Sequence, residues 1–299
     1  MQKIKFTSSR GEIQFTDNET QEYGGKWVPF RLAAFDPNSQ GTSQTAVNCL
    51  DMDARHVVDE RLNPKSIGVT VRFDGRGYNG SLTGNSRKSG GESAMYYFRR
   101  LILKHFPLKE TGELEYTNDN GTYYINCCMT EYPVVERQCG TMCEIKFYLT
   151  ANYPYWHKKI VGNEYTAKFD DPASVIVNCN GDIASPIIGT ITCVSAIEGN
   201  TSGVFFKLYQ YEGGASQMAF VKNLAVGQKL VFNTGLDNEV YVKLIDTDGT
   251  ESYANNYVDY RNSELLKNNV GETKWRLKIY GTAGELTIQM QYQNLFVAV

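Results

Sequence analysis

The hydrophobic and polar residues of this chain alternate with a period of two over several long stretches. Apolar side chains occupy every second position in residues 67–73, 123–129 and 145–149. Successive side chains of a β-strand point to opposite faces, so each stretch predicts a strand with one buried face. Gly, Asn, Asp or Pro residues bound these stretches, which favours antiparallel strands joined by turns.

One helix is predicted, in residues 92–106. Its apolar side chains recur at steps of three and four residues, which places Met95, Phe98, Ile102 and His105 or Phe106 on one face. Ser89 or Ser93 could cap its start, and Pro107 cannot continue a helix. A helix lying against antiparallel sheets predicts an α+β N-terminal domain for residues 1–156.

The pattern changes after Trp156. Residues 157–172 are polar and weakly periodic, with the turn signal Asp170-Asp171-Pro172, so they are predicted to form a linker. From residue 173 to residue 299 alternating stretches return and no convincing helix occurs. We therefore expect a mainly β protein whose second domain is a β-sandwich of two sheets.

Composition sets limits on function. The 299 residues are enough for two domains, and a net charge of −3 leaves no broad basic surface for a phosphate backbone. We therefore expect no direct sequence-specific nucleic-acid partner. No apolar stretch is long enough for a membrane helix, so no membrane partner is expected. The cysteines are odd in number and scattered, a poor disulfide framework that fits thiols in a reducing cytosol.

Tyrosine is abundant, with 20 residues. Its large apolar face and polar tip suit surfaces that are exposed in a free subunit and covered in an assembly. A β-rich protein with half-exposed strands would show the same composition, and both interpretations stay open.

A glycine-rich segment matches the dinucleotide-binding pattern G-x-G-x-x-G in sequence, but its surroundings do not fit that function. Residues 75–80 read G-R-G-Y-N-G after a predicted strand, but the mechanism requires a helix that begins at the third glycine. Residues 81–91 are instead rich in Gly, Ser and Asn. We expect a loop there and no nucleotide cofactor.

Metal sites and catalytic centres are not indicated either. The spacing of Cys127, Cys128, Cys139 and Cys143 fits no usual zinc site, and adjacent strand residues point to opposite faces, so buried thiols are expected. Asp246-Thr-Asp248-Gly249 is too short for a calcium loop and predicts a hairpin turn. The acidic cluster matches neither a calcium loop nor an H-E-x-x-H motif; it comprises Asp51, Asp53, His56, Asp59 and Glu60. The histidines, at positions 56, 105 and 157, lie in different segments.

Two sugar-related interpretations remain. Paired carboxylates for glycoside cleavage occur in any β protein, and only geometry could single one out. Trp275, Tyr257 and Tyr260 could form a sugar-stacking platform on the second domain, but Trp275 shares the alternation of Leu277 and Ile279 and is expected in the core.

Three segments carry a resemblance to a known family. The chain opens with a short strand and turn in residues 1–12, continues with residues 112–118, which include Gly112 and Leu114, and reaches Tyr153-Pro-Tyr-Trp156 near its midpoint. In this order and spacing it resembles the distal tail proteins of long-tailed bacteriophages along nearly its whole length. Shorter matches in residues 180–182, 227–230 and 271–280 resemble the second domain of that family, a jelly-roll sandwich similar to galectins.

The resemblance implies a structural protein of the virion tail, assembled in the host bacterial cytoplasm, and not an enzyme. The N-terminal domain would form a ring of identical subunits, six-fold in the family, and the sandwich would dock other proteins. Its partners would be the tail tube protein, tail-tip proteins and receptor-binding proteins. The structural motif is expected to comprise Gly112, Leu114, Tyr153, Pro154, Tyr155 and Trp156. Pro154 cannot donate a hydrogen bond to a neighbouring strand, so the strand of residues 145–149 should end there, and the Trp156 ring should lock the domain junction. Single and double rings stay open, and the alternative is a carbohydrate-binding module that recognises cell-surface glycans.

Overall fold

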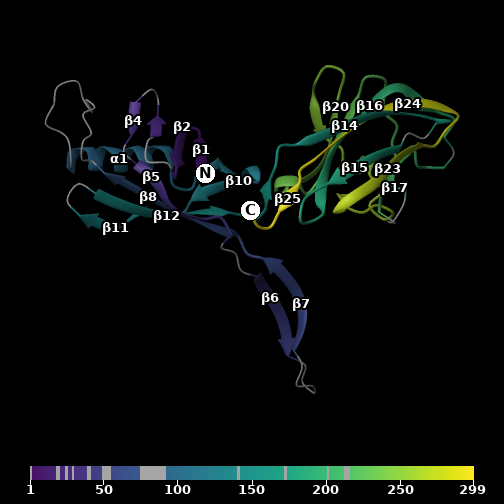
Figure 1. Ribbon diagram of the computed structural model, residues 1–299. Coiled ribbons are helices and arrows are strands. Elements are labelled where there is room, and N and C mark those ends of the chain that lie inside the picture. Colours follow the sequence, from purple (N-terminus) through teal and green to yellow (C-terminus); the bar gives the residue numbers. More distant parts are fainter. Residues whose placement is uncertain are drawn as a thin grey trace. The chain divides into compact units, whose positions relative to one another are not determined.

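The computed structural model describes residues 2–17, 21–23, 26–28, 30–38, 42–48, 55–74, 92–139, 142–171, 174–200, 202–211 and 216–299. It is mainly β, with one α-helix among these residues, which confirms the expected fold class (Figure 1). The chain divides into two compact units, one of Met1–His157 with Val297–Val299 and one of Lys158–Phe296. No helix in the described part of the chain is long and apolar enough to cross a membrane.

The first unit is built on one antiparallel sheet. Its main path runs in the order β2-β1-β9-β10-β12-β8-β5, β11 pairs with β12, and β13 pairs with β10. These strands are β1 (Lys3–Ser8), β2 (Gly11–Thr16), β5 (Phe30–Asp36), β8 (Lys65–Asp74), β9 (Thr111–Asn118), β10 (Gly121–Met129), β11 (Val134–Cys139), β12 (Met142–Ala151) and β13 (Trp156–His157). Two further pairs form small sheets of their own: β3 (Gln21–Tyr23) with β4 (Lys26–Val28), and β6 (Thr42–Asn48) with β7 (Arg55–Leu62).

The alternation in the sequence marks the buried face of this sheet correctly. The alternating apolar side chains of β8, β10 and β12 are all buried, as predicted: Ile67, Val69, Val71, Phe73, Tyr123, Ile125, Cys127, Met129, Ile145, Phe147 and Leu149. Because one face packs against the core, the register of each strand pair is fixed by these residues.

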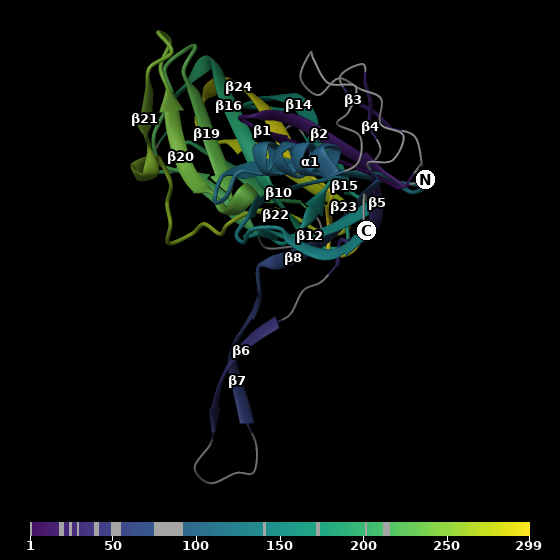
Figure 2. The same ribbon diagram turned by 90° about the vertical axis from the view of Figure 1, so that its left-hand side faces the viewer.

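The predicted helix is present as α1 (Glu92–His105). It contacts β1, β2 and β12, and Figure 2 shows it lying across the strands of the first unit. Ile102 is buried, and Phe106, directly after the helix, stacks on Phe6 of β1 with ring centroids 4.3 Å apart. Phe106 also contacts the ring of Phe147 at 4.8 Å. The helix end is therefore fixed by aromatic packing on the sheet.

The second unit is a β-sandwich. One sheet runs β14-β24-β16-β19-β20-β21, with β22 on β16, and the other runs β15-β23-β17-β18. The strands are β14 (Val161–Lys168), β15 (Ser174–Cys179), β16 (Ser185–Glu198), β17 (Phe206–Gln210), β18 (Gln217–Phe220), β19 (Lys229–Thr234), β20 (Val240–Ile245), β21 (Glu251–Tyr253), β22 (Lys267–Asn268), β23 (Gly271–Ile279), β24 (Ala283–Tyr292) and β25 (Leu295–Phe296), with short 3-10 turns at η1 (Leu236–Asn238) and η2 (Asn255–Tyr257).

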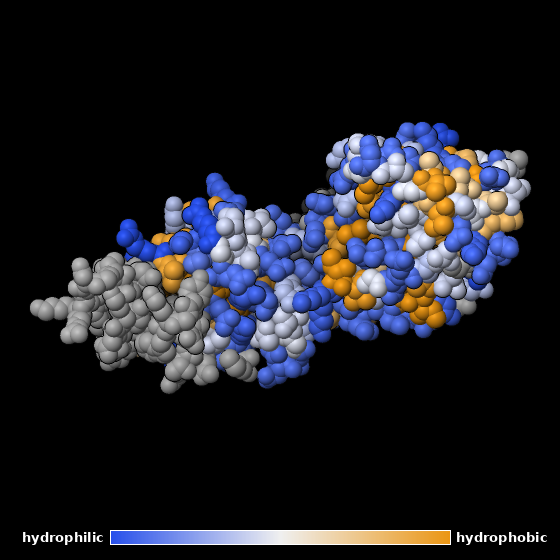
Figure 3. All heavy atoms as spheres, turned by 90° about the horizontal axis from the view of Figure 1, so that it is seen from above, coloured by the Kyte–Doolittle hydropathy of each residue, from blue (hydrophilic) through white to orange (hydrophobic). Residues whose placement is uncertain are grey.

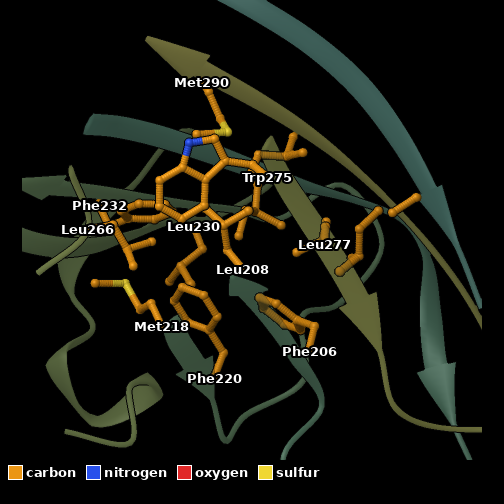
Figure 4. Close-up of a cluster of buried hydrophobic side chains, with 14 of the residues drawn as sticks. Phe206, Leu208, Met218, Phe220, Leu230, Phe232, Leu266, Trp275, Leu277 and Met290 are labelled. Atoms are coloured by element: carbon orange, nitrogen blue, oxygen red, sulfur yellow. The ribbon is translucent and has the colours of Figure 1, made fainter. Parts of the chain in front are cut away.

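A single hydrophobic core lies between the two sheets of the second unit. Figure 4 shows Trp275 at its centre, with Leu230 and Phe232 from β19 and Met290 from β24 around it. The rings of Phe206 and Phe220 stack with centroids 4.8 Å apart. The turn that the sequence predicts at residues 246–249 joins β20 to β21. In this turn the backbone N–H of Gly249 donates a hydrogen bond to the Asp246 carbonyl oxygen at 2.9 Å.

The prediction of a linker in residues 157–172 is wrong for most of that segment. Residues 161–168 form β14, which pairs along its full length with β24. β14 is an edge strand, and among its side chains only Ala167 is fully buried. An edge strand with so little apolar burial carries almost no hydrophobic alternation, which is why its sequence resembles a loop.

Candidate functional site

The aromatic motif at the end of the first unit is built around a buried tryptophan. The Trp156 side chain is fully buried, and its indole Nε1 donates a hydrogen bond to the Pro37 carbonyl oxygen at 3.1 Å. The rings of Trp156 and Phe35 meet edge to face, with their centroids 6.4 Å apart. The centroid of the Trp156 ring lies 6.0 Å from that of the Tyr116 ring. These partners all belong to the first unit, and the satisfied donor and aromatic packing support a structural role for Trp156.

The residues before Trp156 end one strand and begin another. After β12 the chain turns through Tyr153, Pro154 and Tyr155, and β13 then pairs with β10, with His157 opposite Tyr124. Pro154 is buried and has no backbone N–H to donate, so it suits the break between the two strands. The rings of Tyr153 and Tyr155 meet edge to face at 5.1 Å, and burial raises the pKa of Tyr155.

Gly112 and Leu114 lie on β9, away from the turn that carries the motif. Leu114 is fully buried and pairs in register with Phe6 of β1. A Cβ atom at Gly112 would lie 2.5 Å from Phe6 Cζ and 2.6 Å from the Thr7 carbonyl oxygen. The backbone of β9 can therefore approach β1 this closely only because position 112 carries no side chain.

Tyr116 connects β9, which carries Gly112 and Leu114, to the aromatic segment of residues 153–156. It lies on the same face of β9 as Leu114, two positions further along, and its ring contacts Trp156. No sequence motif indicated Tyr116, Phe35 or Pro37 as part of this site. The alternation of residues 112–118 could have indicated Tyr116, whereas nothing local marks Pro37, which lies 119 residues from its partner Trp156.

The two histidines whose side chains the structure describes are both buried. Burial lowers the pKa of His157 to about 4, so the ring is neutral, and it stacks on Tyr124 with centroids 6.1 Å apart. His105 is the last residue of α1 and lies against Gly11 of β2, and its pKa is also lowered, chiefly by burial. The side chain of His56 lies outside the described residues. Both described rings are thus accommodated as neutral groups in the packed interior of the first unit.

The cysteines behave as buried thiols where the structure describes them. Cys127 and Cys143 are buried and free, as predicted, and burial raises the pKa of both thiols. Cys128 points to the other face of β10 and is only half-buried. Within the described residues no group of three or more His, Cys, Asp or Glu could hold a metal ion.

The glycine-rich segment 75–91, Asp51 and Asp53, and the side chains of His56, Asp59, Glu60 and Cys139 lie outside the described residues.

The sugar-stacking platform is not assembled. Trp275 is fully buried in the core of the second unit, where its Nε1 donates a hydrogen bond to Asn268 Oδ1 at 2.6 Å. Tyr257 packs partly against the same core, and only Tyr260 is well exposed. This confirms the expectation that Trp275 faces the core, and it removes the indole from any sugar-binding surface.

Exposed aromatic and aliphatic side chains are spread over both units. Figure 3 shows hydrophobic areas between hydrophilic ones on one face of the molecule. Tyr132 is 73% exposed in the first unit, and Tyr253 is 77% exposed in the second. Large rings with a polar tip at such positions suit contacts with other proteins.

The hairpin of β6 and β7 is the clearest candidate for an assembly surface. The two strands pair antiparallel from Thr42 opposite Leu62 to Asn48 opposite Arg55. Among the described residues they pair with no other strand and form a small sheet of their own. Both outer edges of the hairpin therefore present backbone N–H and C=O groups that the described strands leave unpaired.

Comparison with known proteins gives structural matches. No protein-family model and no curated protein matches the chain. The crystal structure of the SPP1 Dit protein, described as a paradigm of the hub adsorption apparatus in phages that infect Gram-positive bacteria, matches with a TM-score of 0.62 and 8% identity over 99% of each chain. The phage P2 baseplate in its activated conformation with Ca matches with a TM-score of 0.41 and 10% identity, over 97% of this chain and 98% of that chain. This chain thus has the fold of the SPP1 Dit protein over nearly its whole length.

Proposed function

We propose that this protein is a structural subunit of the tail tip of a long-tailed phage or prophage. It forms a ring, six-fold as in the distal tail family, that joins the tail tube to the baseplate and receptor-binding proteins. The first unit makes the ring, and the second unit docks tip proteins. It acts in the virion tail after assembly in the host cytoplasm, and it performs no catalysis.

The observation that carries this proposal is the match of the fold across both units. The SPP1 Dit protein, which is described as a hub of the adsorption apparatus, aligns over 99% of both chains. A match confined to one sandwich would fit many unrelated functions, because folds of this class are widely reused. Two different units in the same order are a far more specific combination.

The β6–β7 hairpin supports self-assembly on physical grounds. A two-stranded hairpin alone is at best marginally stable in water, and exposed strand edges tend to pair with another chain. The strands span Thr42–Asn48 and Arg55–Leu62, long enough to present many backbone groups to a neighbour. A head-to-tail contact of this kind closes into a ring when the rotation between subunits permits it.

The carbohydrate-binding alternative has less support. Its specific sequence feature was the platform with Trp275, and that side chain is buried.

The test is the oligomeric state with and without the hairpin. Light scattering coupled to size exclusion, and negative-stain images, should show closed rings for the wild type at high concentration or with tube and tip proteins. A variant in which a Gly/Ser linker replaces residues 42–62 should remain monomeric with an unchanged melting temperature. A control variant with a Gly/Ser replacement of the exposed turn at residues 246–249 should still form rings.

Two results would contradict the proposal. Wild-type protein that stays monomeric beside its tube and tip partners would exclude the ring. If rings still form without residues 42–62, the proposed ring stands, but the hairpin is not the contact that forms it.

A further inference from the structure

The outer face of the smaller sheet of the second unit carries an unusual set of side chains. On β17 and β23 every second residue faces the core, including Leu208 and Trp275. The residues between them face outward. On β17 they are Lys207 and Tyr209, followed by Tyr211, and on β23 they are Glu272, Lys274, Arg276 and Lys278. We call Lys207, Tyr209, Tyr211, Lys274, Arg276 and Lys278 the cationic face.

This face is basic, whereas the unit as a whole is acidic. Residues 158–296 contain 12 Lys or Arg and 15 Asp or Glu, so the unit as a whole is acidic. Glu272 lies 3.6 Å from Lys274. In the part of the chain that the structure describes, no carboxylate forms an ion pair with Lys207, Arg276 or Lys278.

The strand register brings like charges together. Lys207 on β17 lies directly opposite Lys278 on β23. Like charges opposite each other on neighbouring strands destabilise a sheet. Lys207 Nζ reaches a neutral acceptor, Gln217 Oε1, at 3.2 Å. An anionic group placed over this pair would relieve the repulsion.

Tyrosine rings hold the cations on the sheet. The guanidinium of Arg276 lies 3.8 Å from the ring centroid of Tyr211, and Lys207 Nζ lies 4.9 Å from that of Tyr209. Lys278 Nζ lies 4.9 Å from the ring of Tyr280, next to the face. These cation–π contacts orient the cations before a partner arrives, which reduces the entropy lost on binding.

The chemistry favours a protein partner over a sugar. A sugar that stacks on tyrosine needs an open ring face, and here cations already lie over these rings. Arginine and tyrosine are the side chains that most often dominate binding at protein interfaces. Charge complementarity requires the partner to bring anionic groups, and in an unmodified protein these are the carboxylates of Asp and Glu.

We propose that the cationic face is a docking site for an acidic, Asp- and Glu-rich segment of another protein. The proposal rests on the docking role proposed above for the second unit, and it adds the surface and the chemistry of the partner. The carboxylates of that segment would lie over the pair of Lys207 and Lys278 and beside the guanidinium of Arg276.

The experiment measures binding of a fluorescent peptide of about eight glutamates to the full chain by anisotropy at low salt. The face variant carries Lys207→Gln, Arg276→Gln and Lys278→Gln. The control variant carries Lys159→Gln, Lys229→Gln and Arg261→Gln, three exposed cations of the same unit outside this face. The face variant should weaken binding about tenfold, since each exposed ion pair contributes modestly, and the control should change it by less than about twofold.

The outcomes separate this proposal from its alternatives. Equal losses in both variants would show attraction to overall charge only and would overturn the proposal. Polygalacturonate that binds the face more tightly than the glutamate peptide would assign the face to an acidic glycan instead. Light scattering on the wild type and on the face variant reports on ring formation by the first unit separately. Wild-type protein that binds the peptide but forms no ring would contradict only the proposed ring, and a face variant that forms rings but binds the peptide weakly would support both proposals.

Discussion

The buried ammonium group of Lys65 donates a hydrogen bond to the carbonyl oxygen of Val297, with Nζ and O 2.5 Å apart. Lys65 begins β8, and its side chain is fully buried on the same face as Ile67. Nearby, Asn38 Nδ2 donates to the Val299 carbonyl oxygen at 3.2 Å, and the Val299 N–H donates to Asn38 Oδ1 at 3.2 Å. Residues 297–299 are thereby attached to the first unit through two side chains.

The first prediction concerns the pH dependence that Lys65 confers. Burial lowers the pKa of Lys65 from 10.5 to about 8. Between these values the unfolded chain binds a proton that the folded chain does not, so this group makes folding more favourable as pH rises. From roughly pH 7 to pH 10, the free energy of unfolding of the wild type should rise relative to Lys65→Met by on the order of 2 kcal/mol.

The measurement is a series of urea unfolding curves at several pH values. The difference between wild type and variant removes the contributions of other titrating groups. Lys159→Met, at an exposed position, should give a profile parallel to that of the wild type. Parallel profiles for Lys65→Met as well would show that its ammonium group is hydrated in solution.

The second prediction concerns Trp156. Trp156→Ala should lower the free energy of unfolding by about 3–5 kcal/mol, because it leaves a cavity beside Tyr116 and Phe35. Trp156→Phe should cost less, because it keeps an aromatic ring and loses the hydrogen bond to the Pro37 carbonyl. Thermal and urea unfolding check both values. An unchanged melting temperature for Trp156→Ala would point to an exposed indole with a role in recognition.

The third prediction concerns Gly112. Gly112→Ala should destabilise the first unit by about 1–3 kcal/mol, because the new methyl group would overlap the Phe6 ring and the Thr7 carbonyl oxygen. Gly162→Ala is the matched control on β14, where a Cβ would lie 3.7 Å from the nearest described atom, Gln291 Cγ. Equal unfolding midpoints for the two variants would contradict the close approach of β9 to β1.

The fourth prediction concerns the boundary between the units. Lys159 and Ile160 are exposed between β13 and β14, so limited trypsin digestion should cut there early and yield fragments close to half the chain. Mass spectrometry identifies the cut. Early cleavage within residues 240–244, in the middle of a sheet, would contradict this division.

Local patterns in the sequence predicted much of the secondary structure. The alternation of residues 67–73 and the three- and four-residue steps of residues 92–106 each report which face of one element is buried. β8 and α1 confirm both. The pattern failed at β14, because an edge strand with one fully buried side chain has no hydrophobic period to detect.

What the sequence determined by itself is therefore the class of fold and the buried face of most elements, because both follow from short-range periodicity. Which distant segments meet was decided only by the tertiary structure. The contact of Trp156 with Pro37, the bond from Lys65 to Val297 and the opposition of Lys207 and Lys278 join residues 71 to 232 positions apart. Strand register and packing fix such pairs, and a period of two along one strand contains no information about the partner strand.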